Sequence, residues 1–384
     1  MSLIVQKFGG TSVATKERLL NVANIIKNTY SNNNKVVVVI SAQGNTTDEL
    51  LKMAKELNLT PCAREMDVLL SAGEQISMAL LSILLNKIDI NSISLTGWQA
   101  GIQTCDTYGN ARIQNIFTDR IKNELKDNKV VIVAGFQGIN KNKDITTMGR
   151  GGSDTSAVAI AAALNADECQ IYTDVNGIYT ADPKIVIDSK KLKKISYRDM
   201  VNLADLGTQV LNKRSVEVAK KYNVEISVLS AKNEDISGTK VCEIDNRSNS
   251  VVSIAIDENL FVLKCNIEDF QKISRDIIDK EVYTSDIIFV SNQLNMFINK
   301  EKIERVRSFL KKCKKYEIDK NISKISIVGS NKEENFKKFT TIIDLFKNIE
   351  IKFVNMENIF YIVVNKEDGH CALKLIHKIF DLDL

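Results

Sequence analysis

Residues 149–164 read GRGGSDTSAVAIAAAL, a glycine-rich turn followed by an alanine-rich helical pattern. The glycines let the main chain approach a ligand closely, and Arg150 can bind a carboxylate or phosphate through two parallel hydrogen bonds. A helix from Thr155 to Leu164 would add the partial positive charge of its first amides. The stretch therefore predicts an anion site, and the alternative is a glycine turn capped by Ser153 or Asp154.

Short β-branched runs alternate with helical patterns on both sides of this stretch, up to about residue 245. In the first helical pattern Leu19, Val22, Ile25 and Ile26 fall on one stripe, as burial against a sheet requires. Strand, helix, strand order is typical of a parallel sheet covered on both faces. We therefore predict a three-layer α/β domain with an open, mostly parallel sheet over residues 1–245. Its strands are expected at 3–8, 36–40 and 130–134, and its helices at 15–27, 47–57 and 155–164.

From about residue 247 the units become shorter and richer in lysine, asparagine and isoleucine. Two successive α+β units of the β-α-β-β-α-β kind explain their order. We expect them at about 250–320 and 321–384, either contiguous or interleaved, within a region 246–384. The predicted strands are 251–256, 260–264, 286–290, 294–298, 324–328, 349–354 and 360–364, and the predicted helices are 268–278, 302–314, 334–346 and 371–380.

The composition excludes several classes of protein. A net charge of +4 in 384 residues makes no general case for nucleic acid or an anionic membrane, and no run reaches eighteen apolar residues. Seven cysteines without a C-x-x-C pair suggest neither zinc nor disulfides, and the N-terminus carries no secretion signal, so we expect a cytoplasmic protein. The two histidines, His370 and His377, are interpreted as structural.

The N-terminal run Lys7-Phe8-Gly9-Gly10-Thr11-Ser12 ends a strand and turns into a helix. It places a lysine and two glycines at the carboxyl edge of the sheet, where open parallel sheets bind ligands. Neither the Walker A nor the G-x-G-x-x-G pattern is present, so we predict another kind of phosphate cradle, or else a structural turn. The loop from Ser41 to Thr47 follows the next strand and is either part of this cradle or a helix cap.

Two further stretches have both a structural and a functional interpretation. Ser71-Ala72-Gly73-Glu74 has the form of a capping box, but a Glu74 that faces the cleft would pair with an ammonium group while Arg150 holds a carboxylate. The stretch from Tyr172 to Lys184 carries Asn-Gly and Asp-Pro turn signals. It is either an ordinary hairpin or a nucleoside pocket.

These motifs, in this order, resemble those of the aspartate kinase family, which has the amino acid kinase fold. The resemblance covers most of the chain and implies that Lys7, Gly9 and Gly10 contact ATP phosphates, with Ser41 nearby. It implies that aspartate is held by Thr47, Glu74, Arg150 and Ser153, that Asp154 organises Lys7 and the transfer site, and that the nucleotide is surrounded by Thr173, Asp174, Tyr179 and Lys184. No protein side chains are assigned to a metal, because Mg2+ would be held mainly through the phosphates.

The implied reaction transfers the γ-phosphoryl group of ATP to the side-chain carboxylate of L-aspartate, at the entry to lysine, threonine and methionine synthesis. The family also implies paired ACT units and a homo-oligomer. Two alternatives remain: a kinase of the same fold for glutamate, carbamate or a nucleotide, and a non-catalytic effector-binding regulator. The chain departs from the family pattern at Gln209, where a lysine is usual, and at Asn212-Lys213, where His-Pro is usual. It also departs in both ACT loops, at 266–269 and 329–333, which leaves feedback by lysine or threonine open.

Overall fold

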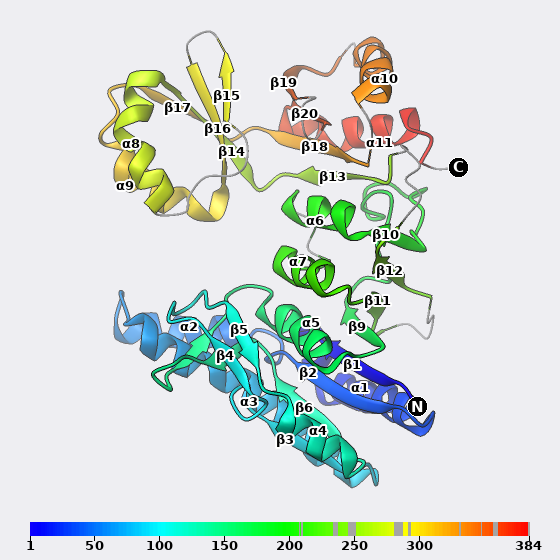
Figure 1. The fold of residues 1–384 in the computed structure, drawn as a ribbon. Coiled ribbons are helices and arrows are strands. Elements are labelled where there is room, and N and C mark those ends of the chain that lie inside the picture. The colour runs from blue at the N-terminus through cyan, green and yellow to red at the C-terminus, as the bar shows by residue number, and fades with distance from the viewer. Residues whose placement is uncertain are drawn as a thin grey trace. The chain divides into compact units, whose positions relative to one another are not determined.

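The computed structural model describes residues 1–206, 208, 210–232, 237–244, 251–279, 287–290, 293–329, 332–346, 348–355 and 360–382. Two compact units are formed (Figure 1). The first contains residues 1–178, 191–204 and 209–246, and the second contains residues 179–190, 205–208 and 247–384. The predicted division near residue 246 stays a prediction, because residues 245–250 lie outside the described ranges.

The first unit is organised by an eight-stranded sheet in the order β10-β12-β11-β9-β1-β2-β6-β3. All neighbouring strands are parallel except β11 and β12, which confirms the mostly parallel sheet. β1 is central because its residues Ile4 to Phe8 are bonded on both sides and three of its side chains are buried apolar groups. The strands are β1 (Leu3–Phe8), β2 (Lys35–Ile40), β3 (Ser92–Leu95), β6 (Val130–Ala134), β9 (Glu168–Thr173), β10 (Lys194–Ser196), β11 (Ile226–Ser230) and β12 (Thr239–Cys242).

Helices lie on both faces of this sheet, as the strand and helix alternation predicts. On one face α1 (Lys16–Ser31) and α3 (Ala63–Lys87) share a hydrophobic core with the side chains of β1, β2 and β6, and Leu19, Val22 and Ile26 are buried in it as expected. On the other face α5 (Gly152–Leu164) contacts β1, β2, β9 and α7 (Lys213–Tyr222). The remaining helices are η1 (Gly10–Val13), α2 (Thr46–Leu57), α4 (Asp119–Lys126) and α6 (Tyr197–Asp205).

A small second sheet in the first unit was not predicted from the sequence. It has the order β5-β4-β7-β8, with strands Ile113–Ile116, Ile102–Thr104, Gln137–Ile139 and Ile145–Thr147. Strands of three or four residues are too short to establish a period-2 pattern, so they carry little sequence signal.

Helix α3 contradicts the capping-box interpretation of Ser71-Ala72-Gly73-Glu74. All four residues lie in the interior of this 25-residue helix, which begins eight residues earlier at Ala63. By length and composition α3 is also the one candidate for a membrane span in the described part of the chain. This is weak evidence, because the buried helices of globular cores pass the same test, and α3 contributes Met78, Leu81 and Leu85 to the core.

The second unit contains two four-stranded antiparallel sheets that interleave along the chain. One has the order β15-β16-β14-β17 and the other β13-β18-β20-β19, so β13 pairs with a strand about seventy residues later rather than with its neighbour β14. The contiguous alternative of 250–320 and 321–384 is therefore not what the strand pairing shows. The strands are Ser253–Asp257 (β13), Leu260–Asn266 (β14), Ile287–Val290 (β15), Gln293–Asn299 (β16), Tyr316–Asp319 (β17), Ser323–Val328 (β18), Ile351–Asn355 (β19) and Phe360–Val364 (β20).

All eleven elements predicted in this region are present, and β17 is an addition. The helices are Ile267–Asp279 (α8), Ile303–Leu310 (α9), Lys332–Leu345 (α10) and Gly369–Ile379 (α11), with short turns at Lys300–Lys302 (η2) and Lys366–Asp368 (η3). His377 of α11 is structural, as expected: it is buried, and its Nε2 lies 2.9 Å from the hydroxyl of Thr180. The sheets with their helices are consistent with the ACT-like units that the sequence resemblance implies.

Candidate active site

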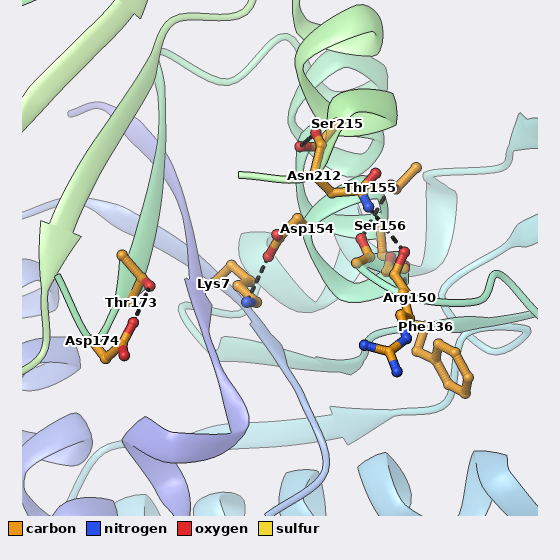
Figure 2. A network of polar contacts seen from close by, with 12 residues as sticks. Lys7, Phe136, Arg150, Asp154, Thr155, Ser156, Thr173, Asp174, Asn212 and Ser215 are labelled. Atoms are coloured by element: carbon orange, nitrogen blue, oxygen red, sulfur yellow. Dashed lines mark hydrogen bonds and ion pairs between the residues drawn. The ribbon is translucent and has the colours of Figure 1, made fainter. Parts of the chain in front are cut away.

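Lys7 lies in the centre of the sheet, paired in register with Val39 of β2 and Ile171 of β9. Its ammonium forms an ion pair with Asp154, with 2.5 Å between Nζ and Oδ1, and the two side chains are only 11% and 13% exposed. The pairing joins the carboxyl end of β1 to the first turn of α5, as Figure 2 shows. The structure thus brings together the two residues that the resemblance implies for catalysis.

The glycines after β1 allow its loop to pass close to both Lys7 and the loop after β2. A Cβ on Gly9 would lie 3.5 Å from the Lys7 ammonium nitrogen, and a Cβ on Gly10 would lie 2.6 Å from the carbonyl oxygen of Ala42, which is too close. The Gly10 carbonyl in turn accepts a hydrogen bond of 3.0 Å from the Gly44 amide. The two loops therefore form one continuous backbone surface at the sheet edge.

Ser41 and Thr47 belong to this same edge. The Ser41 amide donates to the carbonyl of Phe8 at 3.1 Å, which ties the end of β2 to the end of β1. Thr47 lies in the first turn of α2, whose N-cap is Asn45, so Thr47 is not the cap. No described contact shows a ligand role for either residue.

Glu74 faces inward from the middle of α3 toward the loop after β2. It is 3% exposed, and its Oε1 accepts a hydrogen bond of 3.1 Å from the Ala42 amide. Its Oε2 is buried and accepts no hydrogen bond from any described residue. Burial raises the pKa of Glu74 to about 7, against a smaller opposite effect of the Ala42 hydrogen bond. Glu74 is therefore a buried acid that changes charge near neutral pH, and its ionised form would attract a cation.

The glycine-rich turn starts α5 without a side-chain cap. Gly151 occupies the N-cap position with φ of 70°, a left-handed conformation that favours glycine, while Ser153 and Asp154 lie inside the helix. The alternative of a turn capped by Ser153 or Asp154 is therefore wrong. Arg150 is exposed, whereas Ser153 is buried. A Cβ on Gly135 would lie 2.8 Å from the Ser153 side chain, so Ser153 packs tightly against the turn after β6.

Thr173 is the last residue of β9 and Asp174 follows it, two and three residues beyond Ile171, which pairs with Lys7 of the neighbouring strand. The Thr173 hydroxyl donates to Asp174 Oδ1 at 3.1 Å. In Figure 2 the Lys7–Asp154 pair lies between these two residues and the loop of Arg150. Tyr179 and Lys184 belong to the segment 179–190 of the second unit, where the Lys184 amide donates to Asp182 at 2.9 Å. Their nucleotide role stays a prediction, and Gln209 lies outside the described residues.

Two residues, Asp67 and Phe136, contact the segments before and after the glycine-rich turn in a way that the sequence did not predict. Asp67 is fully buried, and its carboxylate accepts hydrogen bonds from the amide of Gly109 and from both the amide and hydroxyl of Thr147. Phe136 has φ of 69°, which is strained for an aromatic residue, and its amide donates to the Ser156 hydroxyl at 3.1 Å. Nothing in the local sequence around either residue predicts these contacts, because both link segments that are distant along the chain.

Comparisons with known proteins identify the family of this chain. Residues 2–230 match the model of the amino acid kinase family. The chain is 41% identical to the aspartokinase of Bacillus sp. (strain MGA3) over 100% of this chain and 98% of that protein, and 41% identical to the aspartokinase of Geobacillus stearothermophilus over the same shares. Its fold is similar to that of E. coli aspartokinase III solved with aspartate and ADP, with a TM-score of 0.81, 20% identity and coverage of 98% and 99%. The chain therefore belongs to the amino acid kinase family and, within it, to the aspartokinases.

Proposed function

We propose that this protein is an aspartate kinase, which transfers the γ-phosphoryl group of ATP to the side-chain carboxylate of L-aspartate and releases 4-phospho-L-aspartate and ADP. The observation that carries the proposal is the largely buried Lys7–Asp154 pair at the end of the central strand, in a chain that matches named aspartokinases over its whole length. We place catalysis in residues 1–245 and regulation in residues 246–384.

The acceptor needs no general base. A side-chain carboxyl with a pKa of about 4 is ionised at neutral pH, so the nucleophile is already formed. The difficulty is the repulsion between two anions, which positive groups must offset where charge builds up. Lys7 and the first amides of α5 supply positive charge at the end of β1, with Gly9 and Gly10 allowing the phosphates to approach. Asp154 holds the Lys7 ammonium in place.

Arg150 and Glu74 have complementary charges for an amino acid substrate. We assign Arg150 to the α-carboxylate and Glu74 to the α-ammonium group, with Thr47 and Ser153 as further polar contacts. Held in this way, the side-chain carboxylate would point toward the γ-phosphate, and such orientation supplies much of the rate acceleration. Thr173 and Asp174, together with Tyr179 and Lys184, are assigned to the nucleotide.

Mg2+ is assigned to the phosphates of ATP. Within the described ranges, no three His, Cys, Asp or Glu side chains gather as a metal-binding group. The ion, when bound, would neutralise phosphate charge during transfer.

Three further properties are part of the proposal. The antiparallel sheets of the second unit support paired ACT units, through which we expect the protein to form a homo-oligomer. Aspartate phosphorylation would serve lysine, threonine and methionine synthesis. The composition and the free cysteines support a cytoplasmic location, with small molecules rather than nucleic acid or membranes as partners.

Substrate profiling by ADP release tests the proposal against a kinase for another acceptor. Purified protein with ATP and Mg2+ is offered L-aspartate, L-glutamate, carbamate and UMP separately. We expect ADP release to depend on aspartate, with glutamate at least about tenfold poorer because one additional methylene misplaces the carboxylate. Faster ADP release with any other acceptor would favour the alternative enzyme, and none with any acceptor would favour a regulator.

The KM for aspartate is expected to rise as the pH falls through 7, because only ionised Glu74 can pair with the substrate ammonium. The pKa of about 7 lies well above the ordinary pKa of a glutamate carboxyl, so Glu74 becomes protonated as the pH falls below 7 while aspartate stays ionised. At pH 6 about one tenth of Glu74 would be ionised, which predicts a KM about tenfold higher than at pH 8. The measurement is steady-state kinetics from pH 6 to pH 8.

Glu74→Gln should give a high aspartate KM that no longer changes with pH, while the ATP KM stays within about threefold. Glu65→Gln is the matched control, since Glu65 lies on the same helix but is exposed and paired with Arg64. A flat KM in the wild type, or an unchanged slope in Glu74→Gln, would remove Glu74 from the substrate site.

A further inference from the structure

We propose that Asn212 is a positioning residue for aspartate binding, which acts by holding the main chain of Arg150. The inference rests on the proposed function for its consequence, because Arg150 is assigned there to the substrate carboxylate.

The Asn212 side chain makes two bonds at once. Its Oδ1 accepts from the Arg214 amide at 2.9 Å and so caps α7, while its Nδ2 donates to the Arg150 carbonyl oxygen at 3.0 Å. Figure 2 shows Asn212 beside the main chain of the glycine-rich turn. An amide is suited to this double task because it offers a donor and an acceptor on one short rigid group.

Arg214 binds residues that precede the same turn. Its Nη1 donates to the Met148 carbonyl oxygen at 3.1 Å, and its Nη2 donates to Asn110 Oδ1 at 2.6 Å. The N-terminal end of α7 is therefore hydrogen-bonded to the main-chain carbonyl groups of Met148 and Arg150. Ser215 adds a further contact to Asn212, because its hydroxyl donates to the Asn212 carbonyl at 2.6 Å.

Close packing leaves the turn little freedom while Asn212 is present. A Cβ on Gly151 would lie 2.3 Å from Asn212 Nδ2, so the glycine and the amide are in direct contact. The bond to the Arg150 carbonyl fixes the peptide plane between Arg150 and Gly151 and thereby the direction in which the Arg150 side chain leaves the backbone. Loss of that bond frees the plane and lowers the fraction of molecules in which the guanidinium meets the substrate.

The decisive variant is Asn212→Ser, because serine caps a helix about as well as asparagine but is too short to reach the Arg150 carbonyl. We expect its aspartate KM to rise about fivefold, the effect of losing one hydrogen bond, with kcat within about threefold of the wild type. Asn212→Ala should show the same KM and a lower Tm, since it loses the cap as well.

Asn223→Ala is the matched control. Asn223 ends the same helix with φ of 52°, so alanine there strains the backbone and lowers the Tm without touching the turn. Its aspartate KM should equal that of the wild type.

Hydrogen exchange of the amides at 149–152 supplies a readout that needs no activity. We expect faster exchange in Asn212→Ser and none of this change in Asn223→Ala. Unchanged exchange and an aspartate KM within twofold of the wild type in Asn212→Ser would overturn the proposal. Failure of the proposed function would look different: the wild type would show no aspartate-dependent turnover, while the exchange effect of Asn212→Ser would persist.

Discussion

Lys7→Ala is expected to lower kcat by about a hundredfold or more, because the variant lacks the positive charge nearest the proposed transfer site. The ammonium lies on the central strand with only 11% of the side chain exposed, so water replaces it poorly. The negative charge of the transition state would then lie near the Asp154 carboxylate, which no longer has Lys7 to neutralise it. The measurement is kcat from ADP release at saturating ATP and aspartate.

Loss of folding must be separated from loss of chemistry in this variant. Removing one partner of a largely buried ion pair leaves an uncompensated charge and costs stability. The double variant Lys7→Ala/Asp154→Asn removes both charges and should recover the Tm but not the turnover. A double variant with near-normal kcat would show that Lys7 has no phosphate role.

Arg150→Ala is expected to lower kcat/KM for aspartate about a hundredfold, which is the effect of losing a bidentate bond between charged groups. The ATP KM should stay within about threefold. Because Asn212 holds the backbone carbonyl of Arg150, the substitution should leave the turn in place. Steady-state kinetics with each substrate varied in turn gives both constants.

Two further variants make this result specific. Arg150→Lys keeps the charge but not the planar fork, so we expect an intermediate loss. Arg120→Ala removes an exposed guanidinium that pairs with Glu124 on α4, and it should leave both KM values unchanged. An equal rise in both KM values in Arg150→Ala would place the guanidinium with the nucleotide or with neither substrate.

The layers of the fold were predictable from the sequence, because each depends on a local pattern. The stripe of Leu19, Val22 and Ile26 predicted the buried face of α1, and the predicted strand at residues 3–8 became β1. The short strands of the second sheet lacked such a pattern. The pairing of β13 with β18 could not be predicted either, because the periodicity of a strand indicates which of its faces is buried but not which strand lies beside it.

The candidate site was predictable only in part. Glycines and charged residues at the ends of strands marked Lys7, Arg150 and Asp154, since such residues have few structural uses together. Glu74 was ambiguous because S-x-x-E fits a capping box equally well. Only the extent of α3 showed that these residues do not begin a helix. The supporting contacts of Asp67 and Asn212 gave no local signal. Asp67 binds Gly109 and Thr147, which are 42 and 80 residues away, and Asn212 binds Arg150, which is 62 residues away.

Trapping of the acyl phosphate tests the central claim most directly. Purified protein is incubated with ATP, Mg2+, L-aspartate and hydroxylamine, with and without lysine, threonine or both, and aspartyl hydroxamate is measured alongside ADP. We predict hydroxamate in equal amount to ADP without effectors, and none when aspartate is omitted. Wild-type protein that binds ATP and aspartate but forms no hydroxamate would contradict the account.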